Sequence, residues 1–315
     1  MAIEQWLVTS PKTLDIEHVH ELQVTLIGGS LNVLTHDAPY TRVEARVTSG
    51  APLRIAMDGN RLIVDHPQVR HRGFGSSLRS LIEGAEAEVS IALPRTARIH
   101  ASSVNADLFV SGLRAPLDFA TTGGRLLFDA VNGPVRAKSV SGDVYARNHE
   151  GTFTARTGSG DIIASGRIDH AETMTVSGET LIDVRRVLPD HVSLRSTTGK
   201  ITLRLPSDAH PMYAITSAVH PYQLDGQQLP ATRGTSWRSP HAEHEAELSD
   251  IRLGTVSGRI GVVRGPSAQP RELEGPTAPQ SPAEAALSAE MTARVTELSE
   301  RLGVTETQHD TESEA

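Results

Sequence analysis

The chain has 315 residues, and its formal net charge of −8 at pH 7 argues against nucleic acid as its general partner. It contains no cysteine, which excludes disulfides and cysteine-ligated zinc. With 38% hydrophobic and 22% charged residues it has the composition of a folded soluble protein, and the 3% aromatic content suits thin β-layers filled by aliphatic side chains.

The N-terminus lacks a basic region followed by an apolar run, so we expect no secretion signal. No run of about 18 apolar residues occurs, and we therefore expect no transmembrane segment. Cytoplasmic localisation follows as the expectation.

Residues 1–90 are expected to form an N-terminal β-rich cap. Short alternating segments such as 22–27, 31–35 and 43–48 are separated by turn signals, for example Gly28-Gly29. The cap is expected to cover the open edge of the segment that follows.

Residues 91–264 carry an internal repeat. Its marker, usually glycine, recurs every 18 residues and then at longer intervals, at Ala106, Gly124, Gly142, Gly160, Gly178, Gly199 and Gly258. Repeats of this length indicate an architecture in which neighbouring copies bury one another's apolar side chains.

Each copy of the repeat alternates in the manner of β-strands. Apolar residues stand mostly two and four positions after the marker, and a serine or threonine always stands three before it. We therefore predict two short strands per copy, with a turn at the marker and another near mid-repeat, and expect glycine there because it reaches positive φ. The pattern predicts a β-solenoid or a stack of β-hairpins, with two- or three-sided copies left open.

Residues 207–250 are expected to be a degenerate excursion of this repeat domain. Its first part, 207–222, fits a degenerate copy in which Tyr213 and Ile215 face inward.

The C-terminal part changes composition. We expect a proline-rich linker at 265–282, an amphipathic helix at 283–303 and a disordered acidic tail at 304–315. The helix carries one apolar stripe, formed by Leu287, Met291, Val295, Leu298 and Leu302. This stripe is the predicted partner-binding element; docking on the β domain, pairing with another copy and binding a protein partner all remain open.

Stacking would bring three acidic residues together just after their markers. Asp143, Asp161 and Glu179, here called the acidic edge, form a weak candidate site for a cation such as Ca²⁺. Ordinary solvated turn residues are the favoured interpretation, so no metal and no cofactor is assigned.

Histidines and catalytic motifs give no stronger signal. His149, His170 and His191 fall near the mid-repeat turns and are expected at the surface, because their offsets from the markers drift. No zinc-protease motif and no serine nucleophile motif is present in the sequence.

The strings 140–144, 158–162 and 256–260, such as Ser159-Gly160-Asp161, resemble a bacterial β-strand-repeat family of unknown function named "putative adhesin". The resemblance covers about residues 10–264 and implies an all-β, right-handed β-solenoid-like stack of ~18-residue two-strand repeats, with the N-terminal β cap and a short C-terminal helix added. Some relatives are associated with envelope stress, and the family has no established catalytic residues to transfer.

The functional expectation is a non-enzymatic binding or scaffolding protein of unknown ligand, linked to the cell envelope through that resemblance. The alternative is a carbohydrate-active β-helix enzyme of the polysaccharide lyase or hydrolase type, which would use acidic residues from neighbouring copies. Protein partners or self-association are expected through the helix.

Overall fold

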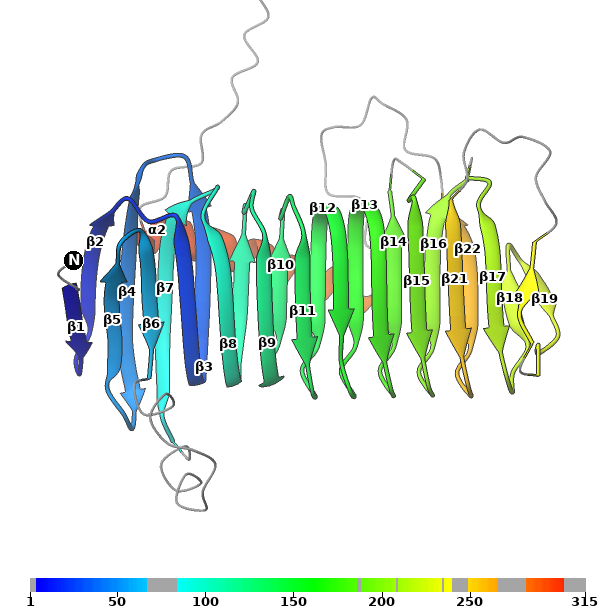
Figure 1. Ribbon diagram of the computed structural model, residues 1–315, viewed down its shortest axis with the longest axis horizontal. Coiled ribbons are helices and arrows are strands. Elements are labelled where there is room, and N and C mark those ends of the chain that lie inside the picture. The colour runs from blue at the N-terminus through cyan, green and yellow to red at the C-terminus, as the bar shows by residue number, and fades with distance from the viewer. Residues whose placement is uncertain are drawn as a thin grey trace, which may run out of the picture.

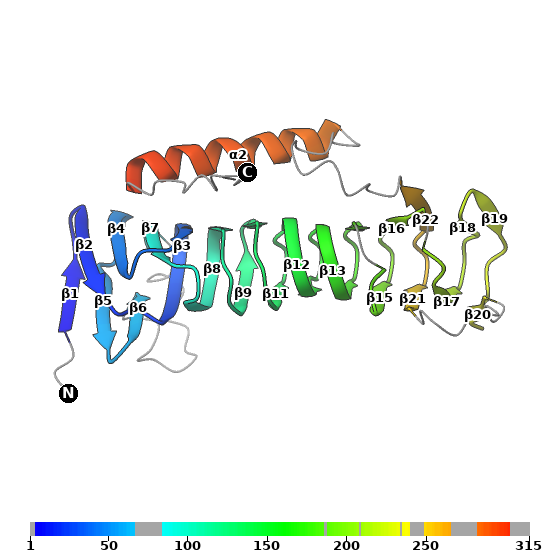
Figure 2. The same ribbon diagram turned by 90° about the horizontal axis from the view of Figure 1, so that it is seen from above.

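The computed structural model describes residues 4–66, 84–185, 188–207, 209–233, 235–239, 249–265 and 282–302. They form an elongated β structure in two layers, with helix α2 (Pro282–Leu302) lying along one face (Figures 1 and 2). Because the expected linker (265–282) and acidic tail (304–315) fall almost entirely outside these residues, those two expectations remain predictions.

The N-terminal strands pair in both directions. Four antiparallel pairings join β1 to β5, β2 to β4, β4 to β7 and β5 to β6. Strand β3 instead pairs in parallel with β6, β7 and β8. These strands are β1 (Glu4–Val8), β2 (Lys12–Glu17), β3 (Glu21–His36), β4 (Tyr40–Ser49), β5 (Leu53–Asp58), β6 (Arg61–Asp65), β7 (Glu86–Pro94) and β8 (Arg98–Ser111).

The strands that follow β8 pair in parallel, with equivalent positions of the repeat opposite one another. Leu126, for example, lies opposite Leu108 on one side and Val144 on the other. These strands are β9 (Leu117–Gly123), β10 (Leu126–Asp129), β11 (Val135–Ser139), β12 (Val144–Arg156), β13 (Ile162–Thr175), β14 (Thr180–Val184), β15 (His191–Ser196) and β16 (Ile201–Pro206).

This pairing corrects the expected fold class: a solenoid stack of two-strand repeats is not what the structure shows. Strands β8, β9, β11, β12 and β10 close a ring of five parallel strands, a barrel-like core, and the remaining strands lie outside it.

The ring closes because some strands continue through positions where turns were predicted. β8 is 14 residues long and continues without a break through the marker Ala106. β12 is 13 residues long and continues through Gly151. In β12 the bend is absorbed inside the strand, by positive φ at Asn148 and Gly151 and by two register shifts against β13. One long strand therefore pairs in both layers, where two short strands and a turn were expected.

Strand order at the far end departs from chain order. β21 (Asp250–Thr255) pairs with β15 on one side and with β17 (Met212–Ser217) on the other. β22 (Ile260–Gly265) likewise lies between β16 and β18 (Tyr222–Leu224). The segment expected next after β16 is therefore displaced outward by a later one (Figure 1), and β19 (Gln227–Leu229) and β20 (Trp237–Arg238) pair with it antiparallel.

The inward positions expected from alternation are confirmed. Leu108, Leu126, Val144 and Ile162 are fully buried, and so are most of their counterparts four residues after the marker. Tyr213 and Ile215 are also buried, as expected. Each buried aliphatic side chain contributes roughly 1.5–3 kcal/mol to stability.

The marker glycines are explained differently from the expectation. Among the glycine markers only Gly124 has positive φ, so backbone handedness is not the general reason. A Cβ added at Gly142, Gly160, Gly178, Gly199 or Gly258 would instead collide with the backbone carbonyl oxygen of the preceding marker. Glycine is needed because two backbones approach closely there.

The serine or threonine before the marker fixes this approach. Thr157 Oγ1 accepts a hydrogen bond from the Gly160 N–H at 3.0 Å, and Thr175 Oγ1 accepts one from Gly178 at 3.1 Å. The same bond forms at Gly142, Gly199 and Gly258. The hydroxyl thus gives the N–H of each of these five markers a partner.

Helix α2 is amphipathic and has 21 residues. Among the parts of the chain described, no helix is long and apolar enough to cross a membrane.

Candidate binding surface

The residues under α2 form a second apolar cluster, separate from the main core. On the sheet it comprises Leu34, Ala92, Phe109 and Leu127, with Tyr145 packed at its margin; we call these five residues the outer strip. The predicted helical stripe lies on it: Met291, Leu298 and Leu302 are buried, and Leu287 and Val295 are partly buried. Of the alternatives left open by the sequence, the structure therefore shows the stripe docked on its own β domain.

The outer strip follows from the pleat of the strands. Leu108 and Val110 point into the core, so Phe109 between them must point out. Leu127 and Tyr145 occupy the same position, three residues after the marker, in the next two copies and lie opposite Phe109 and Leu127 respectively. An outward phenylalanine would ordinarily be exposed, yet Phe109 is fully buried because α2 covers it.

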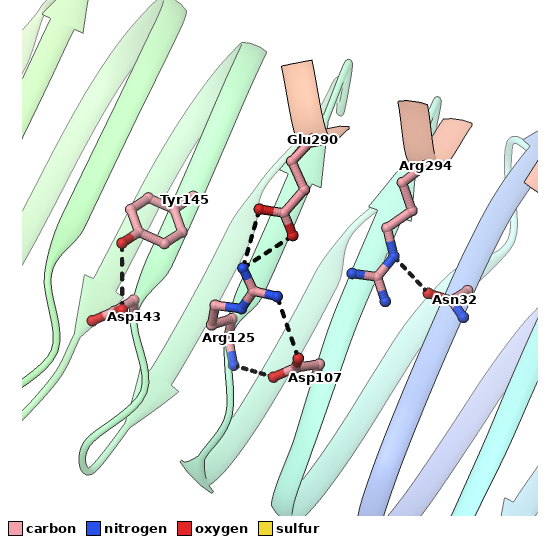
Figure 3. Close-up of polar contacts among 7 residues, drawn as sticks. All are labelled: Asn32, Asp107, Arg125, Asp143, Tyr145, Glu290 and Arg294. Atoms are coloured by element: carbon pink, nitrogen blue, oxygen red, sulfur yellow. Dashed lines mark hydrogen bonds and ion pairs between the residues drawn. The ribbon is translucent and has the colours of Figure 1, made fainter. Parts of the chain in front are cut away.

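Charged and polar groups line the edges of the helix. Arg125 Nη1 lies 3.0 Å from Glu290 Oε1, and Arg125 also contacts Asp107 (Figure 3). Arg147 Nη1 donates to Thr292 Oγ1 at 2.9 Å. At the C-terminal end, Arg301 Nε lies 3.4 Å from Glu44 Oε2. The edges thus fix the direction and register of α2.

Arg294 makes the most specific of these contacts. Its Nε donates to Asn32 Oδ1 at 3.1 Å (Figure 3). Its guanidinium carbon lies 5.5 Å from the centre of the Phe109 ring. Burial lowers the pKa of Arg294, while the Asp107 carboxylate raises it. A cation over an aromatic face contributes roughly 0.5–2 kcal/mol.

Tyr145 closes the other margin of the outer strip. Its hydroxyl donates to Asp143 Oδ2 at 3.3 Å (Figure 3). Burial, helped by the nearby Asp143 and Asp161 carboxylates, raises the pKa of Tyr145 to about 12, so the phenol stays neutral at physiological pH.

The helix does not seal the whole surface. A cavity of 510 Å³ lies beside it, lined by residues that include Asn32, Glu88, Arg294, Glu297 and Arg301. Ile163 and Leu181 continue the column of the outer strip in the next two copies, and both are half-buried. The apolar column is therefore longer than the cluster that α2 covers.

The acidic edge has a structural role in this geometry. Asp143 Oδ1 accepts a hydrogen bond from the Asp161 N–H at 2.9 Å, and Asp161 Oδ1 accepts one from Glu179 at 2.7 Å. Glu179 itself pairs with Lys200 Nζ at 2.7 Å. Each aspartate thus ties its copy to the next, and no group of three or more histidine, aspartate or glutamate residues in the described ranges is placed to hold a metal ion.

The histidine expectation is wrong for one residue. His149 is fully buried, with Nε2 3.2 Å from Thr152 O, because β12 carries it inward at its bulge. His170 and His191 lie opposite one another in the ladder, each near an aspartate: His170 at 3.9 Å from Asp190 and His191 at 3.5 Å from Asp250.

The sequence predicted one half of this surface, the helical stripe, but not the strip of the sheet on which it lies. The helical stripe and the outward Phe109 and Tyr145 are visible separately in the sequence, whereas Arg294 and Glu290 carry no pattern of their own. The available signal was three large apolar residues in succession at an outward position, which indicates a covered face.

Comparisons with known proteins give distant similarities only. No family model matches the chain, and no curated protein matches its sequence. A solved structure described as a "putative lipid binding protein" from Parabacteroides distasonis is 12% identical, with a TM-score of 0.46 over 81% of this chain and 97% of that one.

Two further structures carry an adhesion-related name. A "putative adhesin" from Bacteroides fragilis is 12% identical, with a TM-score of 0.38 over 82% of this chain and 98% of that one. A "putative cell adhesion protein" from Clostridium sporogenes is 10% identical, with a TM-score of 0.29 over 81% and 100%. The expected resemblance is matched in name at low identity, no family model supports a repeat family, and TM-scores this low support no inference about function.

Proposed function

We propose that this chain is a binding protein rather than an enzyme, and that the outer strip is its surface for an amphipathic helix. The observation that carries the proposal is the separate apolar cluster in which Phe109 and Leu127 are buried only because α2 lies over them. A sheet that needed no helix would not place large apolar side chains in succession on its outer face.

The chemistry of the partner follows from what the surface now holds. It accepts a stripe of leucine and methionine, a carboxylate opposite Arg125 and a guanidinium over Phe109. The matching partner is a helix with α2-like spacing: α2 of a second copy, or an equivalent helix of another protein.

The contacts also favour exchange of the helix. Three of the α2 side chains that the structure describes are fully buried. The Arg125–Glu290 pair is about two-fifths exposed on each side, where an ion pair contributes little. The polar cavity beside the helix further reduces the packing between α2 and the sheet. A helix held in this way stays docked mainly because it is tethered, at an effective concentration on the order of millimolar.

Competition between helices tests the proposal. In the full chain, Leu298→Asp places a carboxylate in the apolar interface and should release α2, while the matched exposed change Thr296→Asp should not. A fluorescently labelled peptide of residues 282–302 should then bind the Leu298→Asp chain in anisotropy titrations. It should bind the wild-type and Thr296→Asp chains at least tenfold more weakly.

Two outcomes would contradict the proposal. The first is a folded Leu298→Asp chain, by circular dichroism, that takes up no peptide at several hundred micromolar. The second is equal uptake of a peptide that itself carries Leu298→Asp, because such binding would not depend on the stripe.

Removal of the helix gives a second test. Deleting residues 266–315 should leave a β-rich circular dichroism spectrum, because the cluster under α2 is separate from the main core. The exposed outer strip should increase dye binding, and light scattering should show a changed oligomeric state. Unfolding of the truncated chain would mean that α2 is an obligate part of the fold.

The carbohydrate-active alternative is less well supported. Enzymes of that kind need carboxylates free to act on a substrate, whereas the Asp143 and Asp161 side chains accept backbone hydrogen bonds that hold neighbouring copies together.

A further inference from the structure

Three arginines from distant parts of the chain line a second cavity. Arg195 on β15, Arg238 on β20 and Arg252 on β21 surround a volume of 380 Å³. This cavity lies in the layer that contains β15, β21 and β17, and β20 packs there on the side of the molecule away from α2 (Figure 2). It is therefore separate from the outer strip, and nothing in the proposed function requires it.

The unexpected strand order assembles this cavity. Because β21 inserts between β15 and β17, Arg195 comes to lie opposite Gly254, and Arg252 opposite Ala214. β20 then runs antiparallel against β17 and places Arg238 opposite the same Ala214. In a strictly sequential order, residues 195 and 252 would not be on neighbouring strands.

Small residues keep the cavity open. Gly254 lies at its floor, and a Cβ added there would have no atom within 4 Å. Its φ is not in the positive range, so neither backbone conformation nor crowding demands glycine at this position. Thr216 and Ser236 add hydroxyl groups to the lining.

Among the residues that the structure describes, the charges in this cavity are incompletely balanced. Arg252 pairs with Asp250 at 2.7 Å. Arg195 and Arg238 have no carboxylate within 4.0 Å among the residues that the structure describes. Three arginines that line one cavity repel one another where no counter-charge offsets them, and such a group stands out in a chain whose net charge is −8. A multiply charged anion would relieve it.

We propose that this cavity binds a phosphate or sulfate group. Arginine presents a planar fork of donors that matches such oxyanions bidentately, and two hydroxyl donors are at hand in Thr216 and Ser236. A volume of 380 Å³ lies within the range of small-molecule sites, so the group is carried on a small molecule rather than bound as the free ion.

Trp237 offers a nearby readout, because in the chain it stands between the lining residues Ser236 and Arg238. In a full chain that carries Trp6→Phe, Trp237 is the only tryptophan. We would titrate this chain with inorganic phosphate, glucose 6-phosphate and glucose, and follow its fluorescence. We expect saturable binding of glucose 6-phosphate, weaker binding of inorganic phosphate and no response to glucose.

Three variants tie binding to the cavity. Arg195→Gln and Arg238→Gln should each weaken binding by about tenfold or more, the scale of one charge-assisted hydrogen bond. Gly254→Phe should abolish it by filling the floor without removing a charge. Arg156→Gln is the matched control, because Arg156 pairs with Glu172 in the same layer and its loss changes net charge equally.

The outcomes separate clearly once melting curves show that each variant is folded. Equal binding of inorganic phosphate and glucose 6-phosphate would support the oxyanion site but contradict the inference that the group is carried on a small molecule. No saturable binding of either probe at 10 mM would overturn the proposal. So would an Arg156→Gln effect as large as that of Arg195→Gln, since binding would then reflect general charge.

Discussion

Replacing one marker glycine by alanine tests the explanation of the repeat most directly. In Gly178→Ala the added Cβ would lie 2.5 Å from the carbonyl carbon of Gly160, closer still to its oxygen, and 3.1 Å from Asp161 N. All three are backbone atoms, which cannot rotate away as a side-chain end can. The strands on both sides must therefore separate locally.

The cost can be compared with known overpacking. Inserting one methyl group into a tight core costs about 1–3 kcal/mol, occasionally more. Here the obstacle is backbone, and the displaced carbonyl belongs to a residue whose neighbours also pair across the ladder. We expect about 3 kcal/mol, and at roughly 2 °C per kcal/mol for a large domain the melting temperature should fall by about 6 °C.

Gly261→Ala is the matched control. Gly261 also lies in a parallel strand and has no positive φ, but a Cβ there would meet no atom within 4 Å. At such a position alanine should stabilise slightly, by about 0.4–1 kcal/mol, through the unfolded chain. Thermal melts of the two variants that agree within 1 °C would refute the close-approach explanation.

The remaining predictions use the same melts. Ile162→Asp should destabilise by several kcal/mol because Ile162 is fully buried, whereas Asp161→Asn keeps an oxygen acceptor and should be mild; the reverse ranking would mean that the register is wrong. Burial lowers the pKa of His66 and His149, so the unfolded chain binds protons first as pH falls below about 6.5. Urea midpoints should therefore decrease progressively below pH 6.5, and His149→Gln should flatten that dependence. Millimolar Ca²⁺ should leave the melting temperature unchanged, since the acidic edge already accepts backbone hydrogen bonds; a rise that disappears when all three side chains are changed to amides would contradict this.

Local alternation was enough to predict which side chains form the core. The side chain two residues after each marker must share a face with the one four after it, whatever the strand pairs with. Ile162 and Ala164 are therefore buried as expected. The equal spacing of the markers also places equivalent residues opposite one another, as at Leu108 and Leu126.

Long-range pairing was not predictable in the same way. Residues 212–224 and 250–265 both carry strands that fit the edge left by β15 and β16, and sequence separation favours the nearer segment. The later segment has the marker Gly258, whose backbone can approach Gly199 closely, while the earlier one has His220 at the equivalent place in the register. Close approach, rather than chain order, selects the neighbour.

The candidate surface was missed for a related reason. Phe109 and Met291 are 182 positions apart, and neither position alone reveals the other. The helical stripe predicted that these apolar side chains pack against another surface, but it did not indicate which surface. Only their packing in one cluster shows that the helical stripe and the outward column bury one another.

Fold and binding depend on different positions of the repeat. Parallel pairing in register turns each position into a straight column, so one residue type repeated at one offset becomes an extended surface. The marker column admits almost nothing but glycine, because each backbone touches the next. The outward column tolerates phenylalanine, leucine, tyrosine and isoleucine in succession, since its side chains point toward α2 or solvent and no neighbouring backbone crowds them. Changes such as Phe109→Ser should therefore weaken helix docking and leave the ladder intact, whereas Gly178→Ala acts on the ladder itself. Substitutions at one outward offset can therefore create a new binding surface without changing the packing of the core.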